Sequence, residues 1–326
     1  MTRFIFSRLA WAAPNVVAIL VMCFLIIHIV PGDPVQVLVG DFPTPPGYIE
    51  QVRRDFGLDQ PLHRQLWLYV ANLAQGNLGY SFANRQPVLG LLLAKSQVTL
   101  LLMLPALTLA AVVGVLCAVA AAPRAGSLYD GAITALSLFG YSVPIFWLGQ
   151  ILILIFAVEL RWLPAQGLIS LRTPPTGMAV VWDVLWHLIL PAFSITIYFM
   201  AVVARVARSS VLETLRNDFV LTARSKGLSA RQVMWRHVVP NALIPVITVV
   251  GYNFGSSLTG AILVETVFGW PGLGSLLVTS ITNRDYPVLQ GIFLFTAILV
   301  VVVNLITDFL YSAIDPRTRT AVRGDA

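Results

Sequence analysis

Residues 98–122 read VTLLLMLPALTLAAVVGVLCAVAAA and contain no charged side chain. A helix needs about 20 apolar residues to cross roughly 30 Å of hydrocarbon, where its backbone polar groups must be paired internally. We therefore expect this stretch to cross a membrane as a helix. Five further stretches meet the same requirement, at residues 9–30, 133–158, 188–206, 242–264 and 288–310. The fourth of the six is short and begins either at 188 or earlier, near Trp182. The sequence thus predicts an all-α membrane protein with six transmembrane helices.

The composition excludes a water-soluble fold. Hydrophobic residues make up 57% of the chain and charged residues 11%, whereas ordinary soluble domains carry about 25% charged residues. Cys23 and Cys117 both lie inside apolar runs, where a thiol acts as a small hydrophobe, so we expect no disulfide framework. The four histidines are scattered over different segments, and we expect no metal site.

The distribution of Lys and Arg predicts the orientation. With a cytoplasmic N-terminus, 13 of the 21 cations fall on the inside and eight on the outside. Five of those eight lie in residues 31–97, a segment long enough to follow the positive-inside rule poorly. Both termini are therefore expected in the cytoplasm, and the basic charge needs no nucleic-acid partner to explain it.

Residues 31–97 are too polar to span a membrane and are expected to form a helical insertion on the outer surface. A first helix is predicted at 46–56, ended by Gly57. Leu62, Leu66, Tyr69 and Leu73 recur at helical spacing after Pro61 and predict a second, amphipathic helix against the bilayer or a partner. The alternative is a packed lid without a partner.

The inside loop, residues 207–240, carries the most detailed local signals. Asn217 or Asp218 can cap a short helix that ends at Gly227, with cations in its last turn. The sequence from Ser229 to Gln232 then predicts a capping box that starts a second helix. Phe219 and Ala223, four residues apart, predict a small apolar face with basic flanks, a surface suited to a groove on another protein.

Motifs for independent chemistry are missing from the sequence. It contains no HExxH, no G-x-S-x-G and no nucleotide-binding P-loop, so we expect no catalytic residues. Ser256 and Ser257 could suggest an intramembrane protease, but Gly251-x-x-x-Gly255 on the same helix favours close helix packing. Asp130 and Asp308 are expected near the inner ends of spans, within reach of water. An ion-coupled secondary transporter or an intramembrane enzyme remains the alternative to the interpretation that follows.

Few residues are available for a path through the membrane. Pro105, Pro144 and Pro191 interrupt three spans and indicate kinks. The polar side chains expected to line a translocation path are Ser142, Asn253 and Thr259.

The inside loop resembles a known family. Residues 219–229 read FVLTARSKGLS and residues 236–242 read RHVVPNA, which together are similar to the cytoplasmic signature of binding-protein-dependent ABC importer permeases, E-A-A-x-x-x-G-x9-I-x-L-P. Gly227 and Pro240 hold the family spacing, whereas Leu221, Thr222, His237 and Val239 depart from the general pattern. The T-A-R-x-K-G-L form resembles the dipeptide/oligopeptide/nickel permease branch. Further branch patterns recur in order at residues 31–34, 57–62, 76–81, 265–274 and 315–317.

The resemblance implies a type I ABC importer permease fold and no enzymatic activity of this chain. It divides the chain into the N-terminus and first span (1–30), the insertion (31–97), and a five-helix permease core (98–326) with a coupling loop at about 207–240. The residues that it assigns to coupling are Asp218, Phe219, Thr222, Ala223, Arg224, Lys226, Gly227, Leu228, Arg231 and Pro240.

The resemblance also implies the partners. These are a second homologous permease in a heterodimer, two ATP-binding subunits that use ATP and Mg, an extracytoplasmic solute-binding protein, and the lipid bilayer of a bacterial inner membrane. The chain itself is expected to bind no cofactor. The implied substrates are dipeptides and oligopeptides, with nickel or another small peptide-like solute as alternatives.

Overall fold

The computed structural model describes residues 14–25, 45, 47–55, 60–81, 83–172 and 174–314, without side chains at 52, 55, 254–260, 308 and 310–314. The chain divides into two compact units. The first comprises residues 1–99 and 271–302, and the second comprises residues 100–270 and 303–326.

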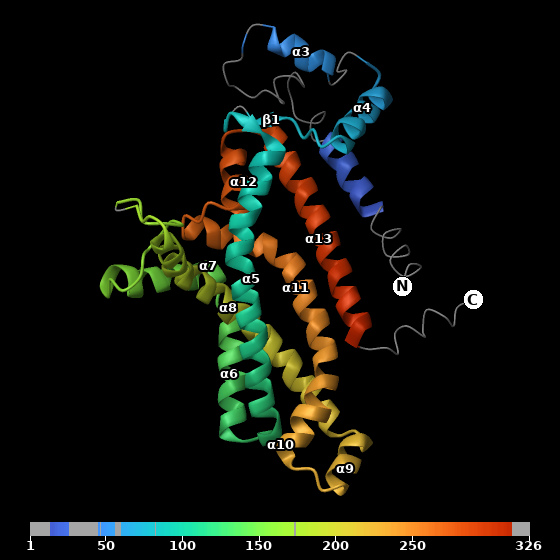
Figure 1. The fold of residues 1–326 in the computed structure, drawn as a ribbon, viewed down its shortest axis with the longest axis vertical. Helices are drawn as coiled ribbons and strands as arrows, with labels where there is room; N and C mark the ends of the chain where they lie inside the picture. Colours follow the sequence, from blue (N-terminus) through green and yellow to red (C-terminus); the bar gives the residue numbers. More distant parts are fainter. Residues whose placement is uncertain are drawn as a thin grey trace, which may run out of the picture. The chain divides into compact units, whose positions relative to one another are not determined.

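The first unit holds a β-hairpin and several short helices. Its described elements are the helix Pro14–Leu25, α3 (Tyr48–Asp55), α4 (Leu62–Ala74), β1 (Tyr80–Ser81), β2 (Gln86–Pro87), the start of α5 (Val88–Ala121), α12 (Leu273–Thr282) and most of α13 (Tyr286–Ile314) (Figure 1). The two strands pair antiparallel, with Tyr80 opposite Pro87 and Ser81 opposite Gln86.

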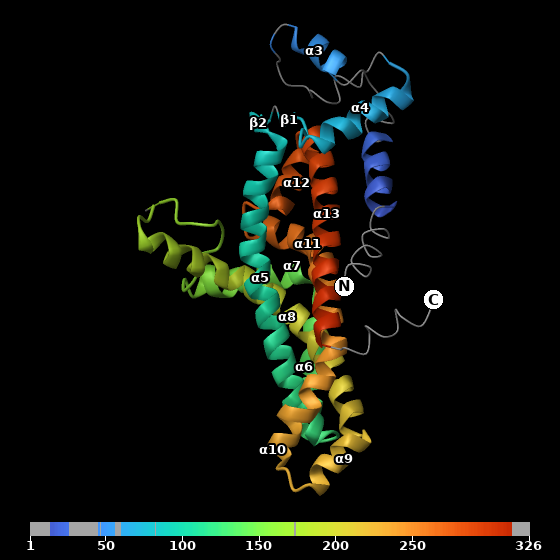
Figure 2. The same cartoon turned by 45° about the vertical axis from the view of Figure 1, so that its right-hand side comes forward.

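The core of the first unit lies between α5, α12 and α13, which lie side by side (Figure 2). Leu92 of α5, Leu276 of α12 and Val288 of α13 are buried there. A Cβ at Gly291 would come 2.6 Å from the side chain of Val88, so α13 approaches α5 closely at this glycine. Ser81 Oγ donates a hydrogen bond of 2.5 Å to Asp285 Oδ2, which fixes the hairpin to the start of α13.

The predicted amphipathic helix in the outer segment is confirmed as α4, but its apolar face is covered within the chain. Tyr69 is buried against Cys23 and Phe24 of the helix Pro14–Leu25, with Leu66 and Leu73 packed beside it. Leu62 alone of the four predicted face residues is largely exposed. The predicted helix at 46–56 is shorter, as α3, and Gly57 lies outside the described residues.

The second unit holds most of the long apolar helices. Its elements are the rest of α5, a 3-10 turn at Ala122–Arg124, α6 (Leu128–Ser142), α7 (Ile145–Leu152), a π-helical turn at Ile153–Glu159, α8 (Met178–Leu215), α9 (Asp218–Ser225), α10 (Ala230–Val233), a π-helical turn at Met234–Val238, α11 (Val239–Val267) and the end of α13.

Four of the six predicted spans correspond to long apolar helices within the described chain. They lie in α5, α8, α11 and α13. α8 begins at Met178 and runs for 38 residues, so the helix that contains the fourth predicted span starts before Trp182. Of the first predicted span, residues 14–25 are described as a helix, and the remainder lies outside the described residues.

The third predicted span is wrong as a single helix. α6 and the following helix Ile145–Glu159 are bent by 98° at the connection that contains Pro144. A proline disfavours helical torsion angles in the residue before it, and Val143 is accordingly extended, with φ −79° and ψ 125°. Pro105 and Pro191, by contrast, lie inside the helices α5 and α8, and Pro245 lies inside α11.

Glycines let the helices of the second unit approach one another. A Cβ at Gly114 of α5 would come 2.9 Å from the side chain of Val203 on α8. The predicted close packing at Gly251 is confirmed, because a Cβ there would overlap the side chain of Thr307 on α13. Ala118, Val203 and Val246 meet in a buried cluster that joins α5, α8 and α11. The short helices α9 and α10 follow α8 in the chain.

Candidate functional site

The helix α9 begins and ends as its sequence predicts. Asn217 is the N-cap residue with an extended backbone, although its side chain makes no capping hydrogen bond. Asp218 lies in the first turn and Arg224 in the last. The negative charge therefore lies at the positive end of the helix dipole and the positive charge at its negative end, and both are favourable. Thr222 Oγ1 donates to the carbonyl of Asp218 at 3.0 Å. The short helix is therefore supported by charge and by local hydrogen bonds.

The bend after α9 is a glycine-dependent helix end. Gly227 has φ +78°, a left-handed conformation that residues with a Cβ rarely adopt. The amide of Gly227 donates to the carbonyl of Arg224 at 2.9 Å, and that of Leu228 donates to the carbonyl of Ala223 at 3.4 Å. These two bonds form a Schellman motif, which satisfies carbonyl groups that the last turn of the helix leaves without a partner. The predicted glycine bend is confirmed.

The start of α10 is the predicted capping box. Ser229 Oγ accepts from the amide of Gln232 at 3.3 Å, and the amide of Ser229 donates to Gln232 Oε1 at 3.0 Å. Two amides that the first helical turn leaves open are thereby satisfied. The chain reverses between α9 and α10 within a few residues, by chemistry that is entirely local.

One face of α9 packs into the protein. Val220 and Ala223 are buried in a cluster with Val211 of α8 and with Val233 and Met234 after the bend. The predicted exposure of Ala223 on a docking face is wrong, because the i to i+3 spacing of Val220 and Ala223 places both on the inner face of the helix. Leu228 is half-buried against the same cluster.

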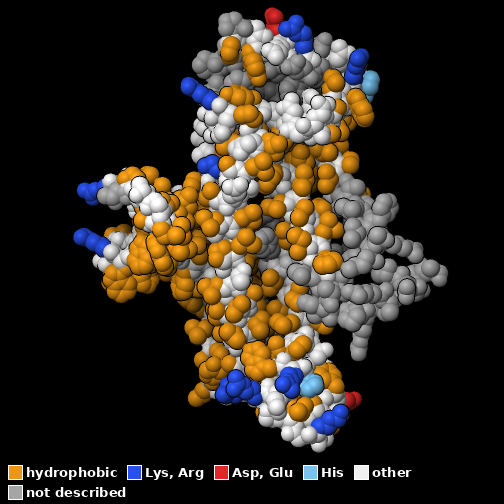
Figure 3. Space-filling model, viewed as in Figure 1, with side chains coloured by type: hydrophobic (Ala, Val, Ile, Leu, Met, Phe, Trp, Pro, Cys, Tyr) orange, Lys and Arg blue, Asp and Glu red, His pale blue; other side chains and the backbone are white. Residues whose placement is uncertain are grey.

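The outer face of this segment combines two apolar side chains with cations. Phe219 is 41% exposed and Leu221 is 66% exposed, so the exposed apolar pair is Phe219 and Leu221 and does not include Ala223. The other sequence-predicted residues that are exposed here are Asp218, Thr222, Arg224, Lys226, Gly227, Arg231 and Pro240. α9 and α10 form one end of the second unit (Figure 1). Figure 3 shows Lys and Arg side chains at this end and apolar side chains over the neighbouring helices. We name the segment 217–233 the elbow.

The residues predicted for a translocation path come from two elements. Ser142 is at the end of α6, is exposed, and donates to the carbonyl of Leu138 at 2.8 Å. Asn253 is half-buried in α11, and Thr259 belongs to the same helix, although its side chain lies outside the described residues. A path along these residues stays a prediction. Within the described residues, no group of three His, Cys, Asp or Glu side chains could hold a metal ion.

Sequence reasoning missed an ion pair that joins two helices next to the elbow. Asp130 of α6 accepts from Arg208 of α8 at 2.6 Å and 2.7 Å, and the amide of Gly126 donates to the same carboxylate at 3.0 Å. Asp130 is only 5% exposed, so the expectation that it reaches water is wrong. The side chain of Asp308 lies outside the described residues. The partners are 78 positions apart, and nothing in their local sequence signals the pairing.

Comparison with known proteins identifies relatives along the whole chain. The family model described as "Binding-protein-dependent transport system inner membrane component" matches residues 110–320, and "Binding-prot-dependent transport system membrane comp, N-term" matches residues 1–103. The chain is 43% identical to a di/tripeptide transport system permease protein of Pseudomonas aeruginosa, over 98% of this chain and 99% of that protein. It is 38% identical to the dipeptide and glutathione transport system permease proteins of Escherichia coli K12, again over 98% of this chain and 99% of each relative.

A solved structure shares the fold. An inward-facing MetNI methionine ABC transporter contains a chain that aligns with a TM-score of 0.55 at 17% identity, over 69% of this chain and 96% of that chain. At this identity the likeness concerns the fold alone, which agrees with the helical permease core expected from the sequence.

Proposed function

This chain belongs to the binding-protein-dependent transport system inner membrane components, and from that membership we propose that it forms half of a translocation path for dipeptides and oligopeptides. It is a permease subunit of an ABC importer and a multi-pass membrane protein. The proposal of a peptide substrate is supported by the relatives, because two are named for dipeptides or tripeptides and one for glutathione, itself a small peptide.

A family of this kind implies an ATPase and a solute-binding protein as partners. The assembly that we propose is a heterodimer of this chain with a homologous permease, carrying two ATP-binding subunits that hold ATP and Mg and one extracytoplasmic solute-binding protein. The excess of cations in the loops predicted to be inside supports cytoplasmic termini and a cytoplasmic elbow in a bacterial inner membrane. This chain itself is proposed to bind no cofactor.

The elbow is proposed to dock on an ATPase and to transmit its movement. The observation that carries this proposal is the combination of a buried inner face and an accessible outer face. Val220 and Ala223 anchor the helix in the protein core, while Phe219 and Leu221 remain exposed among cations. Nucleotide binding can shift the permease only if the ATPase binds its two conformations with different affinity, and the elbow provides a firm contact through which that difference can act.

The test of coupling uses the assembled importer in proteoliposomes. Phe219→Asp and Leu221→Asp place a carboxylate on the outer face while leaving the buried cluster intact. We expect both variants to insert normally but to lose peptide uptake and the stimulation of ATP hydrolysis by the solute-binding protein. Leu128→Asp is the matched control, because Leu128 is 95% exposed at the start of α6 and lies outside the elbow. Normal uptake with both elbow variants would contradict coupling through this surface.

The substrate is tested separately on the unaltered importer. Uptake of a labelled dipeptide that depends on ATP and on the solute-binding protein is the expected result. Uptake of nickel ions without any uptake of peptide would overturn the peptide proposal, and accumulation driven by an ion gradient without an ATPase would overturn the importer mechanism.

A further inference from the structure

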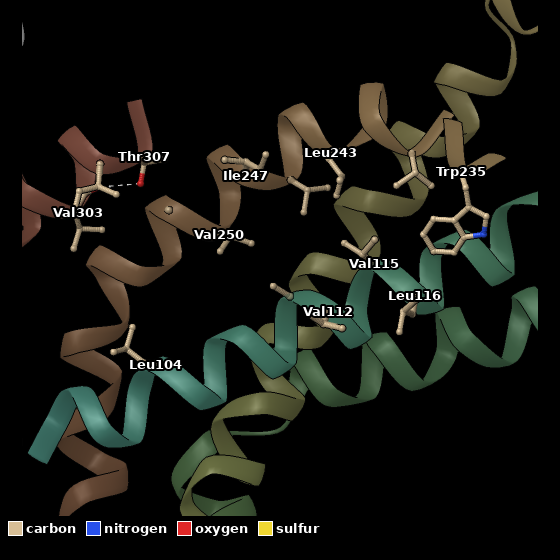
Figure 4. A pocket seen from close by; sticks show the side chains of 15 residues that line it. Leu104, Val112, Val115, Leu116, Trp235, Leu243, Ile247, Val250, Val303 and Thr307 are labelled. Carbon is tan, nitrogen blue, oxygen red and sulfur yellow. Dashed lines mark hydrogen bonds between the residues drawn. The ribbon is translucent and has the colours of Figure 1, made fainter. Parts of the chain in front are cut away.

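An apolar groove lies within the second unit, between α5, α11 and the end of α13. It encloses a volume of about 660 Å³, a size typical of sites for small ligands. Figure 4 shows side chains from the three helices facing this space. The lining includes Leu104, Val112 and Leu116 of α5, Leu243 and Val250 of α11, and Val303 of α13.

The length of the groove matches one leaflet of a bilayer. Leu104 and Leu116 mark its extent along α5, and the rise between them is about 18 Å in an α-helix. The hydrocarbon core of a bilayer is roughly 30 Å thick, so one leaflet contributes about half of that thickness. All three helices that form the groove contain candidate membrane spans, and the groove therefore lies at the depth of acyl chains.

The two ends of the groove differ in chemistry. At one end Gly251 and Thr307 are in close contact, which closes the space between α11 and α13. At the other end lies Trp235, which is 47% exposed, and tryptophan favours the boundary between hydrocarbon and headgroups. Arg231 of α10 and Arg236 in the π-helical turn are the cations nearest to Trp235 along the chain. Both arginines are exposed.

We propose that this groove binds one acyl chain of an anionic phospholipid, with the lipid phosphate held by Arg231 and Arg236. The apolar lining accepts the chain, the closed end at Gly251 limits its depth, and Trp235 lies at the level of the glycerol esters. The assignment to the inner leaflet rests on the cytoplasmic orientation of the elbow proposed above. Lipid binding itself requires neither the ATPase nor a peptide substrate, so it can fail or succeed independently of the proposed function.

The experiment uses the full chain in vesicles that contain phosphatidylglycerol with a photoactivatable group on one acyl chain. After illumination, the labelled residues are identified by mass spectrometry. We expect labels on α5 between 104 and 116 and on α11 between 243 and 250. Val112→Trp fills the groove and should remove most of this labelling. Leu109→Trp is the matched control, because Leu109 is 50% exposed on the same helix, close to the 52% of Val112, and lies outside the groove.

The headgroup is tested with a second pair of variants. One arginine near an anionic surface strengthens binding by roughly fivefold, so Arg231→Gln with Arg236→Gln should lower labelling by phosphatidylglycerol by more than that factor. Arg216→Gln with Arg224→Gln is the control, because these exposed cations of the same region belong to the end of α8 and to α9 and not to the turn that carries Trp235. Equal labelling by a photoactivatable phosphatidylcholine would overturn the anionic headgroup. Unchanged labelling in Val112→Trp, or a helix of the partner permease seated in the groove of the assembled importer, would overturn the lipid site.

Discussion

The elbow and the α6–α7 connection are both pairs of helices joined by a sharp bend, but different forces hold them. The bend of the elbow is formed by its own backbone, through the Schellman motif at Gly227 and the capping box at Ser229, and its inner face packs on α8 through Val220 and Ala223. The α6–α7 connection begins with a local break at Pro144, but neighbouring helices hold it in place. Gly140 lies against Ile197 of α8, and Gly149 lies against Phe268 after α11.

The contrast shows which bend can carry a force applied at the protein surface and which bend is held in place by its neighbours. The shape of the elbow is set within a dozen residues, and its inner face is held on α8 by the cluster around Val220, so a force on its outer face can pass to α8. The shape of the α6–α7 connection depends on contacts with α8 and with Phe268. The elbow is therefore suited to transmit movement, whereas the α6–α7 connection is suited to keep its place between the neighbouring helices. The following variants separate the two kinds of support.

The largest effect is expected from the ion pair at the start of α6. Asp130→Ala removes the carboxylate that accepts both hydrogen bonds from Arg208. A charge left without its partner in a partly buried position is strongly destabilising. We expect a large fall in the thermal unfolding temperature of the purified protein.

The charge reversal Asp130→Arg with Arg208→Asp should restore part of that stability. Arg205→Gln serves as the control, because the side chain of Arg205 is exposed and lies over the ring of Tyr141 at 5.0 Å. Equal unfolding temperatures for Asp130→Ala and Arg205→Gln would show that the ion pair does not hold α6 on α8.

A smaller effect is expected at Gly149 on α7. Leucine at this position would meet the ring of Phe268, because even a Cβ would come 2.9 Å from Phe268 Cε2 and Phe268 is buried. Overpacking of this kind costs about 1–3 kcal/mol. Thermal unfolding should report this loss for Gly149→Leu but not for Gly131→Leu, where a Cβ meets nothing within 4 Å. Equal stability of the two variants would contradict tight packing of α7.

The smallest effect on stability is expected at Gly227, together with a specific effect on transport. Alanine in the left-handed conformation costs about 1–2 kcal/mol, and Gly227 has open space around it, so the strain stays local. Gly126→Ala carries a comparable strain, at φ +83° in the turn between α5 and α6. Both variants should lose similar stability, whereas ATP-driven peptide uptake should fall more in Gly227→Ala. Equal uptake by the two variants would count against a special role of the elbow.

The sequence predicted the elements whose causes are local. Long apolar runs predicted α5, α8, α11 and α13, and the residues from Asn217 to Gln232 predicted both short helices and the bend between them. The family followed from the order and spacing of motifs such as Gly227 and Pro240. In each of these cases, neighbouring residues carry the full physical reason for the structure.

The remainder depends on contacts between distant residues. The exposure of Ala223 was predicted wrongly because the core that covers it is built from α8 and α10. Hydropathy alone could not distinguish a straight third span from a pair of helices bent by 98°, although Pro144 marked the place. The pairing of Asp130 with Arg208 and the contact of Tyr69 with Phe24 likewise required the fold.

Site-specific photocrosslinking in the assembled importer shows whether the outer face of α9 touches the ATP-binding subunit. A photoreactive amino acid replaces Leu221, the most exposed apolar side chain of α9, and a second variant carries it at Leu171, which is 84% exposed between α7 and α8. We predict that Leu221 gives an adduct with the ATP-binding subunit and that Leu171 gives none with that subunit. An importer that transports peptide while Leu221 crosslinks only to lipid or to the solute-binding protein would show that the elbow does not dock on the ATPase.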